Sequence, residues 1–305
     1  MTAPYGDSVR IRVPATSANL GPAFDCAGLA LTCHDVLELG VAASGLKVAM
    51  TGEGAHTLPS GDEHLVVRAF REACAELGWA PPGLRLVAEN AIPQGRGMGS
   101  SAAAVVAGAL GAWALCPDVD TVDRDAVLRL VTALEGHPDN VAACLLGGAT
   151  LSWTSDGGVA AERFDVHPGI RPVLLVPTAT LSTHVARGLL PDVVPHADAT
   201  FNAGRAALLV HALSREPGLL LDATDDRLHQ RQRAAAMPES LTLVERLRGA
   251  GHAAVVSGAG PSVLVLGTAD TELADLTPSG WDVRPLEVDT DGATVVLEKR
   301  GVSSA

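Results

Sequence analysis

Aromatic and basic residues are both scarce in this sequence. The chain of 305 residues holds four Trp, four Phe and one Tyr, yet 47% of it is hydrophobic, so Ala, Val and Leu must build the core. Its 22 Lys and Arg stand against 35 Asp and Glu, which gives a net charge of −13. This charge argues against a nucleic-acid partner, because a phosphate backbone requires a basic face. A small anion bound by backbone N–H groups remains possible.

Cysteines are few, and no two of them form a CxxC pair. The five are odd in number and widely spaced, which favours reduced thiols and a cytoplasmic protein over a disulfide framework. Charge at Asp7 and Arg10 precedes any apolar run, so we expect no signal peptide. Residues 97–117 lack charge altogether, but their Ala, Gly and Ser favour a buried helix over a membrane span. GxSxG and HExxH motifs are absent too, so hydrolytic triads and zinc enzymes have no support.

The length predicts two domains, at roughly 150 residues each. A polar segment rich in Gly and Pro at residues 154–172 marks the boundary, so we predict domains at residues 1–155 and 165–300. Hydrophobic periodicity mixes strands and helices in an α+β fashion. The expected strands cover residues 9–13, 46–50, 84–88, 173–176, 253–257, 263–266 and 294–297, and the expected helices 65–77, 100–114, 123–135, 198–213 and 240–247. Asp62 is the expected cap of the first helix.

The most specific motif lies between an expected strand and an uncharged helix. It reads Pro93-Gln94-Gly95-Arg96-Gly97-Met98-Gly99-Ser100-Ser101-Ala102-Ala103. Alternating glycines allow positive φ and close approach of a ligand, and the helix N-terminus directs N–H groups at an anion. The motif lacks the Walker A lysine and the Rossmann spacing. A flexible glycine turn capped by Ser is the alternative interpretation.

Three further polar groups stand out. Glu135 ends its helix, where the helix dipole disfavours an anion. A bound Mg²⁺ shared with a nucleotide would offset that; the alternative is a solvated surface Glu. Residues 14–25 present Asn19 and Asp25 after the first strand, and residues 137–140 read His-Pro-Asp-Asn. Taken alone, a segment like either of these is more often a turn or helix cap than a functional site, and a lone histidine such as His137 is more often structural than catalytic.

Together these segments resemble the GHMP small-molecule kinases, and among them the homoserine kinases. The similarity covers nearly the whole chain in the family's order. It includes PATSANLGPAFD at 14–25, PQGRGMGSSAAA at 93–104, EGHPDNVA at 135–142, STHVARGLLP at 182–191, FNAGRAALL at 201–209, DRLHQRQR at 226–233 and SGAGPS at 257–262. The resemblance implies an N-terminal α+β domain with the phosphate loop, a ferredoxin-like C-terminal domain, and an active site between them.

The resemblance also implies ligand contacts. ATP would lie with its phosphates over Gly95 to Ser101, and Mg²⁺ would be held by Ser101 (or Ser100) and Glu135. The whole nucleotide segment comprises Pro93, Gly95, Arg96, Gly97, Met98, Gly99, Ser100, Ser101, Ala102 and Ala103.

The implied second substrate is homoserine. Asp25 and Asn19 would bind its ammonium, and Arg187 and Arg233 its carboxylate, a task that suits guanidinium groups. Exposed helix-surface arginines are the alternative. His137 and Asn140 would lie near the reacting hydroxyl as the catalytic pair. Relatives such as mevalonate kinase are thought to place an Asp near this position; with the neutral Asn140, the hydroxyl proton would pass to phosphate or water.

Four departures from the family pattern are visible. Ala23 stands in place of Gly, Met98 in place of Leu, His64 in place of an Asn that often contacts the nucleotide base, and Arg231-Gln232 in place of Pro-Tyr.

The resemblance as a whole makes ATP-dependent phosphorylation of homoserine the preferred function, by a protein that the resemblance suggests to be a homodimer. A GHMP kinase for another small alcohol and a nucleotide-binding regulatory module without turnover are the alternatives.

Overall fold

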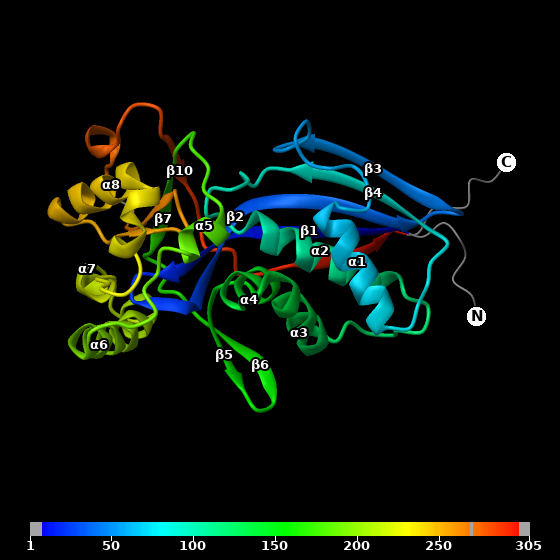
Figure 1. Ribbon diagram of the computed structural model, residues 1–305, viewed down its shortest axis with the longest axis horizontal. Helices are drawn as coiled ribbons and strands as arrows, with labels where there is room; N and C mark the ends of the chain where they lie inside the picture. The colour runs from blue at the N-terminus through cyan, green and yellow to red at the C-terminus, as the bar shows by residue number, and fades with distance from the viewer. Residues whose placement is uncertain (1–7, 269–270, 299–305) are drawn as a thin grey trace.

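Two β-sheets follow one another along the longest axis of the molecule (Figure 1). The computed structural model describes residues 8–268 and 271–298. The larger sheet has seven strands, with β11-β1-β2-β4-β3 in order and β5 and β6 continuing from β2. The smaller sheet has four strands in the order β10-β7-β9-β8. The expected α+β class is confirmed.

The strands have the following bounds: β1 Ser8–Leu20, β2 Ala23–Val41, β3 Gly45–Gly52, β4 Gly83–Asn90, β5 Ala149–Ser155, β6 Gly158–Phe164, β7 Arg171–Val176, β8 Ala254–Val256, β9 Val263–Gly267, β10 Asp282–Pro285 and β11 Thr294–Glu298. The α-helices are α1 Leu65–Glu76, α2 Ser100–Leu115, α3 Arg124–Glu135, α4 Asp139–Leu146, α5 Thr183–Arg187, α6 His196–Ser214, α7 Leu220–Ala223 and α8 Pro238–Gly249. Short 3₁₀ turns cover Pro217–Leu219, Arg231–Ala236 and Ala274–Leu276.

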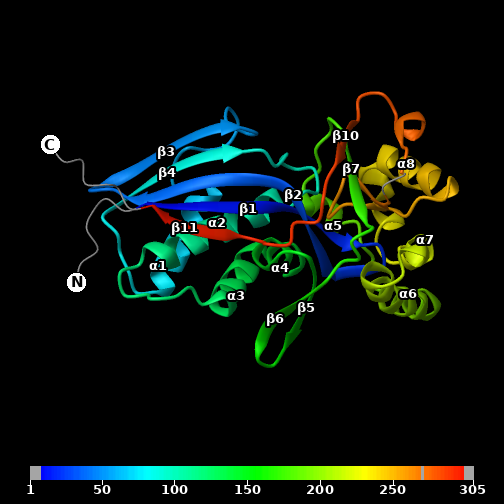
Figure 2. The same ribbon diagram turned by 180° about the vertical axis from the view of Figure 1, so that it is seen from behind.

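Helices α1 to α4 cover one face of the larger sheet, and α2 lies at the centre of this layer (Figures 1 and 2). Most residues of α2 are buried, as the uncharged segment predicted. Its small side chains let α1 approach, because a Cβ at Gly108 would lie 2.4 Å from the Val66 carbonyl oxygen. Within residues 8–268 and 271–298, no helix is both long and apolar enough to cross a membrane.

Most expected elements form within a few residues of their expected bounds, but one expectation was wrong. Asp62 does not cap α1, whose N-cap is His64; Asp62 instead pairs with Arg71 at 2.8 Å. The polar segment at 154–172, the expected domain boundary, contains the end of β5 and all of β6.

Two segments cross between the two halves of the chain. The tip of the β1–β2 hairpin reaches the smaller sheet, where Gly258 N donates to Ala18 O at 2.9 Å. In the other direction β11 pairs antiparallel with β1 in the larger sheet. The division at residues 1–155 and 165–300 stays a prediction, and its ends at 1–7 and 299–300 lie outside the described residues. The glycine-rich loop is also held against the second half, because Ser257 Oγ donates to Gly97 O at 2.6 Å and Leu181 N to Gly95 O at 2.8 Å.

Candidate active site

The three alternating glycines adopt the backbone conformation that the motif predicts. Gly95, Gly97 and Gly99 have φ values of 64°, 69° and 68°. A Cβ at Gly97 would lie 2.1 Å from Ser257 O, and a Cβ at Gly99 would lie 1.9 Å from Thr16 Oγ1. Side chains are therefore excluded on conformational and steric grounds.

The loop leads directly into the N-terminus of α2. This helix begins at Ser100, its N-cap is Gly99, and no described side chain caps it. Its first N–H groups therefore have no side-chain acceptor, and they are suited to bind an anion.

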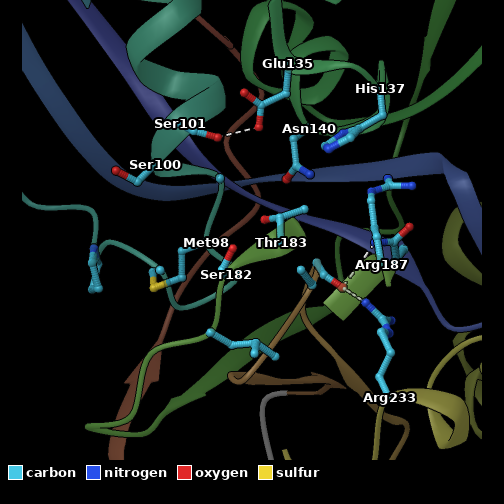
Figure 3. Close-up of a pocket in the computed structure, with 18 of the residues that line it drawn as sticks. Met98, Ser100, Ser101, Glu135, His137, Asn140, Ser182, Thr183, Arg187 and Arg233 are labelled. Carbon is cyan, nitrogen blue, oxygen red and sulfur yellow. Dashed lines mark hydrogen bonds between the residues drawn. The ribbon is translucent and has the colours of Figure 1, made fainter. Parts of the chain in front are cut away.

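A cavity of about 200 Å³ adjoins this loop (Figure 3). It collects expected residues from both halves of the chain. The expected residues that line it are Asn19, Pro93, Gly95, Gly97, Met98, Gly99, Ser100, Ser101, Glu135, His137, Asn140, Arg187 and Arg233. Phe24, Leu181, Thr183 and Gly258 line it too, and sequence reasoning did not single them out. All except Leu181 fall within the quoted motifs, which is the signal that could have found them.

Three expected nucleotide residues do not line the cavity. Ala102 and Ala103 are completely buried. The Arg96 side chain turns toward the second half, where Nε donates to Pro177 O at 3.0 Å and Nη2 to Thr178 O at 3.1 Å. Arg96 thus fixes the position of the loop, and its side chain does not point into the cavity.

A second cavity of about 260 Å³ shares Gly95, Ser100 and Ser101 with the first. Its other walls are mainly apolar, and one of them carries His64. Burial lowers the pKa of His64, whose Nε2 lies 3.2 Å from Met50 Sδ. An apolar chamber beside an anion-binding loop has the character expected of a site for a heteroaromatic base.

Ser101 and Glu135 meet at one end of the first cavity, as Figure 3 shows. The Ser101 hydroxyl donates a hydrogen bond to Glu135 Oε1. Burial raises the pKa of Glu135, although this hydrogen bond acts in the opposite direction. A partly buried carboxylate beside a hydroxyl is a pair of hard oxygen donors, the kind that Mg²⁺ prefers.

His137 and Asn140 are held by a buried carboxylate that the sequence reasoning had not singled out. Asp139 is fully buried, and its Oδ1 lies 2.9 Å from His137 Nδ1. Burial opposes a charged His137, but the hydrogen bond and charge of Asp139 outweigh it and raise the His137 pKa. Thr16 Oγ1 donates to Asn140 Oδ1 at 2.8 Å.

Asp25 and Arg187, expected to contact opposite ends of a substrate, contact each other. Arg187 Nη1 donates to Asp25 Oδ2 at 2.9 Å, and Nη2 donates to Asp25 Oδ1. This contact raises the pKa of Arg187. Both Asn19 and Asp25 have positive φ, at 56° and 57°, and Asn19 Oδ1 accepts from Asp25 N at 2.9 Å. The hairpin thus holds Asp25 in a conformation that non-glycine residues rarely adopt.

The second arginine is buried. Arg233 is 1% exposed, so it is no surface residue, yet it lines the cavity beside Arg187 (Figure 3). Burial lowers its pKa to about 10, which still leaves the guanidinium charged near neutral pH. The cavity therefore presents the guanidinium groups of Arg187 and Arg233 and the carboxylate of Glu135. Asp25 does not line it and adjoins it through Arg187.

Family comparisons agree with this geometry. The family models described as GHMP kinases N terminal domain and GHMP kinases C terminal match residues 64–148 and 207–276. The chain belongs to the GHMP kinase family.

Its curated relatives include the homoserine kinase of Streptomyces coelicolor, at 54% identity over 95% of this chain and 94% of that protein. The homoserine kinase of Clavibacter michiganensis is 50% identical, over 98% of each. A crystal structure of homoserine kinase from Cytophaga hutchinsonii has a TM-score of 0.83 at 24% identity, covering 97% of this chain and 99% of that one. That last likeness concerns the fold alone.

Proposed function

We propose that the protein transfers the γ-phosphate of ATP to the hydroxyl of L-homoserine, giving O-phospho-L-homoserine for threonine biosynthesis. The observation that carries this is one cavity in which Arg187 and Arg233 lie beside a glycine-rich loop, with Asp25 held directly behind the cavity wall by its contact with Arg187. A zwitterionic amino acid needs both an anionic and a cationic partner. The homoserine kinases at 50% and 54% identity support the same reaction.

ATP would occupy the two cavities together. The base would lie in the apolar chamber beside His64, and the phosphates would cross the shared residues Gly95, Ser100 and Ser101. Backbone N–H groups at the start of α2 would bind the phosphates. This supports the roles expected for the loop, with Arg96, Ala102 and Ala103 limited to backbone contacts.

Mg²⁺ fits the adjoining oxygen donors. Ser101 Oγ and the Glu135 carboxylate already contact each other, and Mg²⁺ takes one or two carboxylates together with phosphates. In the described part of the chain no group of three or more His, Cys, Asp or Glu forms a metal site, so phosphate oxygens would complete the coordination. Bound Mg²⁺ would neutralise charge on the transferring phosphate.

Homoserine would replace the direct contact between Asp25 and Arg187. Its ammonium would bind the Asp25 carboxylate and the Asn19 side chain. Its carboxylate would bind the guanidinium groups of Arg187 and Arg233. Each protein charge thereby keeps a partner of opposite sign, which avoids the penalty of an unpaired charge.

The chemical step would then be an in-line attack of the hydroxyl on the γ-phosphorus. Positioning and charge stabilisation dominate such reactions. His137 and Asn140 line the cavity, and the raised pKa of His137 favours its cationic form, which would stabilise charge on the phosphate. Asn140 has no proton-accepting role, so the hydroxyl proton would pass to phosphate or water.

A substrate panel tests this function. With ATP and Mg²⁺, we expect ADP and phosphorylated product from homoserine. Mevalonate lacks the ammonium, so it should give at most about 1% of that kcat/KM, since an unpaired charge costs at least about 3 kcal/mol. Serine and threonine keep both charged groups but carry the hydroxyl one carbon nearer to them, so the hydroxyl should be misplaced for attack and turnover should be lower than with homoserine. Turnover only with another alcohol would support the broader family and contradict the homoserine assignment. ATP binding without any turnover would favour a regulatory module.

Two further features rest on the family resemblance. We expect a homodimer and a cytoplasmic location. The five free thiols are compatible with the latter. Light scattering at micromolar protein would contradict the dimer if the mass in solution equals the 31.1 kDa of one chain.

A further inference from the structure

His229 makes two of the three hydrogen bonds that hold the Arg233 guanidinium. Arg233 Nε donates to the backbone oxygen of His229 at 3.1 Å, and its Nη2 contacts Nδ1 of the same histidine. Its Nη1 donates to Gly258 O at 3.2 Å. A guanidinium has five N–H donors, so these three contacts leave two, one on each terminal nitrogen, for a ligand.

The tautomer of His229 follows from its two contacts. Its Nε2 lies 2.6 Å from Gly21 O, and a carbonyl oxygen only accepts, so Nε2 must carry a proton. In the neutral ring Nδ1 is then an acceptor, which is what an Arg233 N–H requires. Burial lowers the pKa of His229 to about 4, so the ring stays neutral near pH 7.

The backbone around His229 is held by the buried carboxylate of Asp226. Asp226 is buried, and its carboxylate accepts from the N–H groups of Leu228, His229 and Gln230 at 2.9, 3.2 and 2.9 Å. Asn202 of α6 also donates to it, at 2.9 Å. These contacts fix the turn from which the imidazole projects.

We propose that His229 is a positioning residue, whose Nδ1 lone pair aims the two remaining Arg233 donors at the substrate carboxylate. This inference rests on the proposed function. It explains why His229, within the segment DRLHQRQR, is 1% exposed. It also explains why its ring contacts both Gly21 in the β1–β2 turn and Arg233. A histidine that only fills space would need neither contact.

Two substitutions separate the two ring nitrogens. An Asn amide reaches as far from the backbone as Nδ1 does, and a Gln amide as far as Nε2. His229→Asn therefore retains an acceptor for Arg233 and loses the Gly21 contact, while His229→Gln does the reverse. We expect KM for homoserine to rise about 30-fold in the Gln variant, the effect of one lost charge-assisted hydrogen bond, and less than about threefold in the Asn variant. KM for ATP should stay unchanged in both.

A packing control comes from the same half of the chain. Leu220 is 3% exposed and lines neither of the two cavities described, so Leu220→Ala should lower the melting temperature without a selective rise in KM for homoserine. Equal KM changes in the Asn and Gln variants would overturn the positioning role. A wild-type protein that fails to phosphorylate homoserine would instead overturn the proposed function.

A measurement on the unaltered protein makes the test independent of variant folding. Nitrogen NMR of histidine-labelled protein should show one buried ring protonated only on Nε2 from pH 6 to pH 9. His229→Gln removes that signal and so assigns it. If the signal lost in His229→Gln belongs instead to a ring protonated on Nδ1, His229 cannot accept from Arg233 and the inference is refuted.

Discussion

Glu135→Gln should lower kcat by about 10³-fold, the effect expected when one charged stabiliser of the transferring phosphate is lost. The amide keeps the shape of the side chain and still accepts from Ser101, but it offers a metal no negative charge. Steady-state assays at saturating homoserine measure the effect, and the Mg²⁺ concentration needed for half-maximal rate should rise with it.

The stability of this variant should move in the opposite direction. Glu135 is the last residue of α3, where the helix dipole disfavours an anion by roughly a few tenths of a kcal/mol. Burial also raises its pKa, so folding favours the protonated form, and the charged form destabilises the protein above the ordinary Glu pKa of about 4.3. The Gln variant should therefore melt at or slightly above the wild-type temperature at pH 7. This advantage should fade as the pH falls toward 4, because Glu135 then becomes protonated.

Glu76→Gln provides the matched control. Glu76 is the last residue of α1, so the same change at the same helical position tests the dipole alone. It is exposed and lies outside the cavities described above. Unchanged kcat in this variant, with a 10³-fold loss in Glu135→Gln, locates the effect in the site. Equal kcat in wild type and Glu135→Gln would remove Glu135 from the metal assignment.

The glycine-rich loop was predictable because its requirements are local. Positive φ at three alternate residues needs glycine at each, and the uncharged segment that follows needs burial. Both leave a visible pattern in the sequence, and the structure confirms the φ values at Gly95, Gly97 and Gly99.

Strand β2 was not predicted, although it is the longest strand described. Residues 27–31 of this strand are buried without a break, and its pairing with β1 shifts register between Pro14 and Ala15. The buried run has no alternation of apolar and polar residues, and the register shift interrupts the pattern that follows, so periodicity over the whole strand is weak.

The contacts between charged residues were also beyond sequence reasoning. Asp25 and Arg187 are 162 positions apart, and nothing local indicates that they meet in the absence of substrate. From the sequence, a surface position was the alternative interpretation of Arg233, since arginines are rarely buried without a partner. Its burial depends on His229 and Gly258, which a single sequence does not place in space. The site roles themselves stay predictions until the variants are measured.

Asp25→Asn should raise KM for homoserine about 100-fold, because it removes the ammonium partner and leaves Arg187 without its counter-ion; truncating one member of such a pair costs about 2–5 kcal/mol. The change should be selective. 4-Hydroxybutyrate lacks the ammonium, and 3-aminopropan-1-ol lacks the carboxylate. The wild-type preference for homoserine over 4-hydroxybutyrate should nearly vanish in Asp25→Asn, because the homoserine ammonium then has no protein carboxylate to pair with. Arg187→Gln should instead erode the preference over 3-aminopropan-1-ol.

The control is another ion pair of the same chemistry. Asp62 pairs with Arg71 at 2.8 Å on the surface, with both side chains more than half exposed, and exposed pairs contribute little. Asp62→Asn should change neither KM nor the preference between analogues. If Asp25→Asn and Arg187→Gln reduce activity toward all three alcohols by one common factor, the pair maintains the structure of the hairpin and does not read the two charges of the substrate. Opposite changes in preference, with Asp25 governing the ammonium and Arg187 the carboxylate, can arise only if the substrate replaces the direct contact between these two residues.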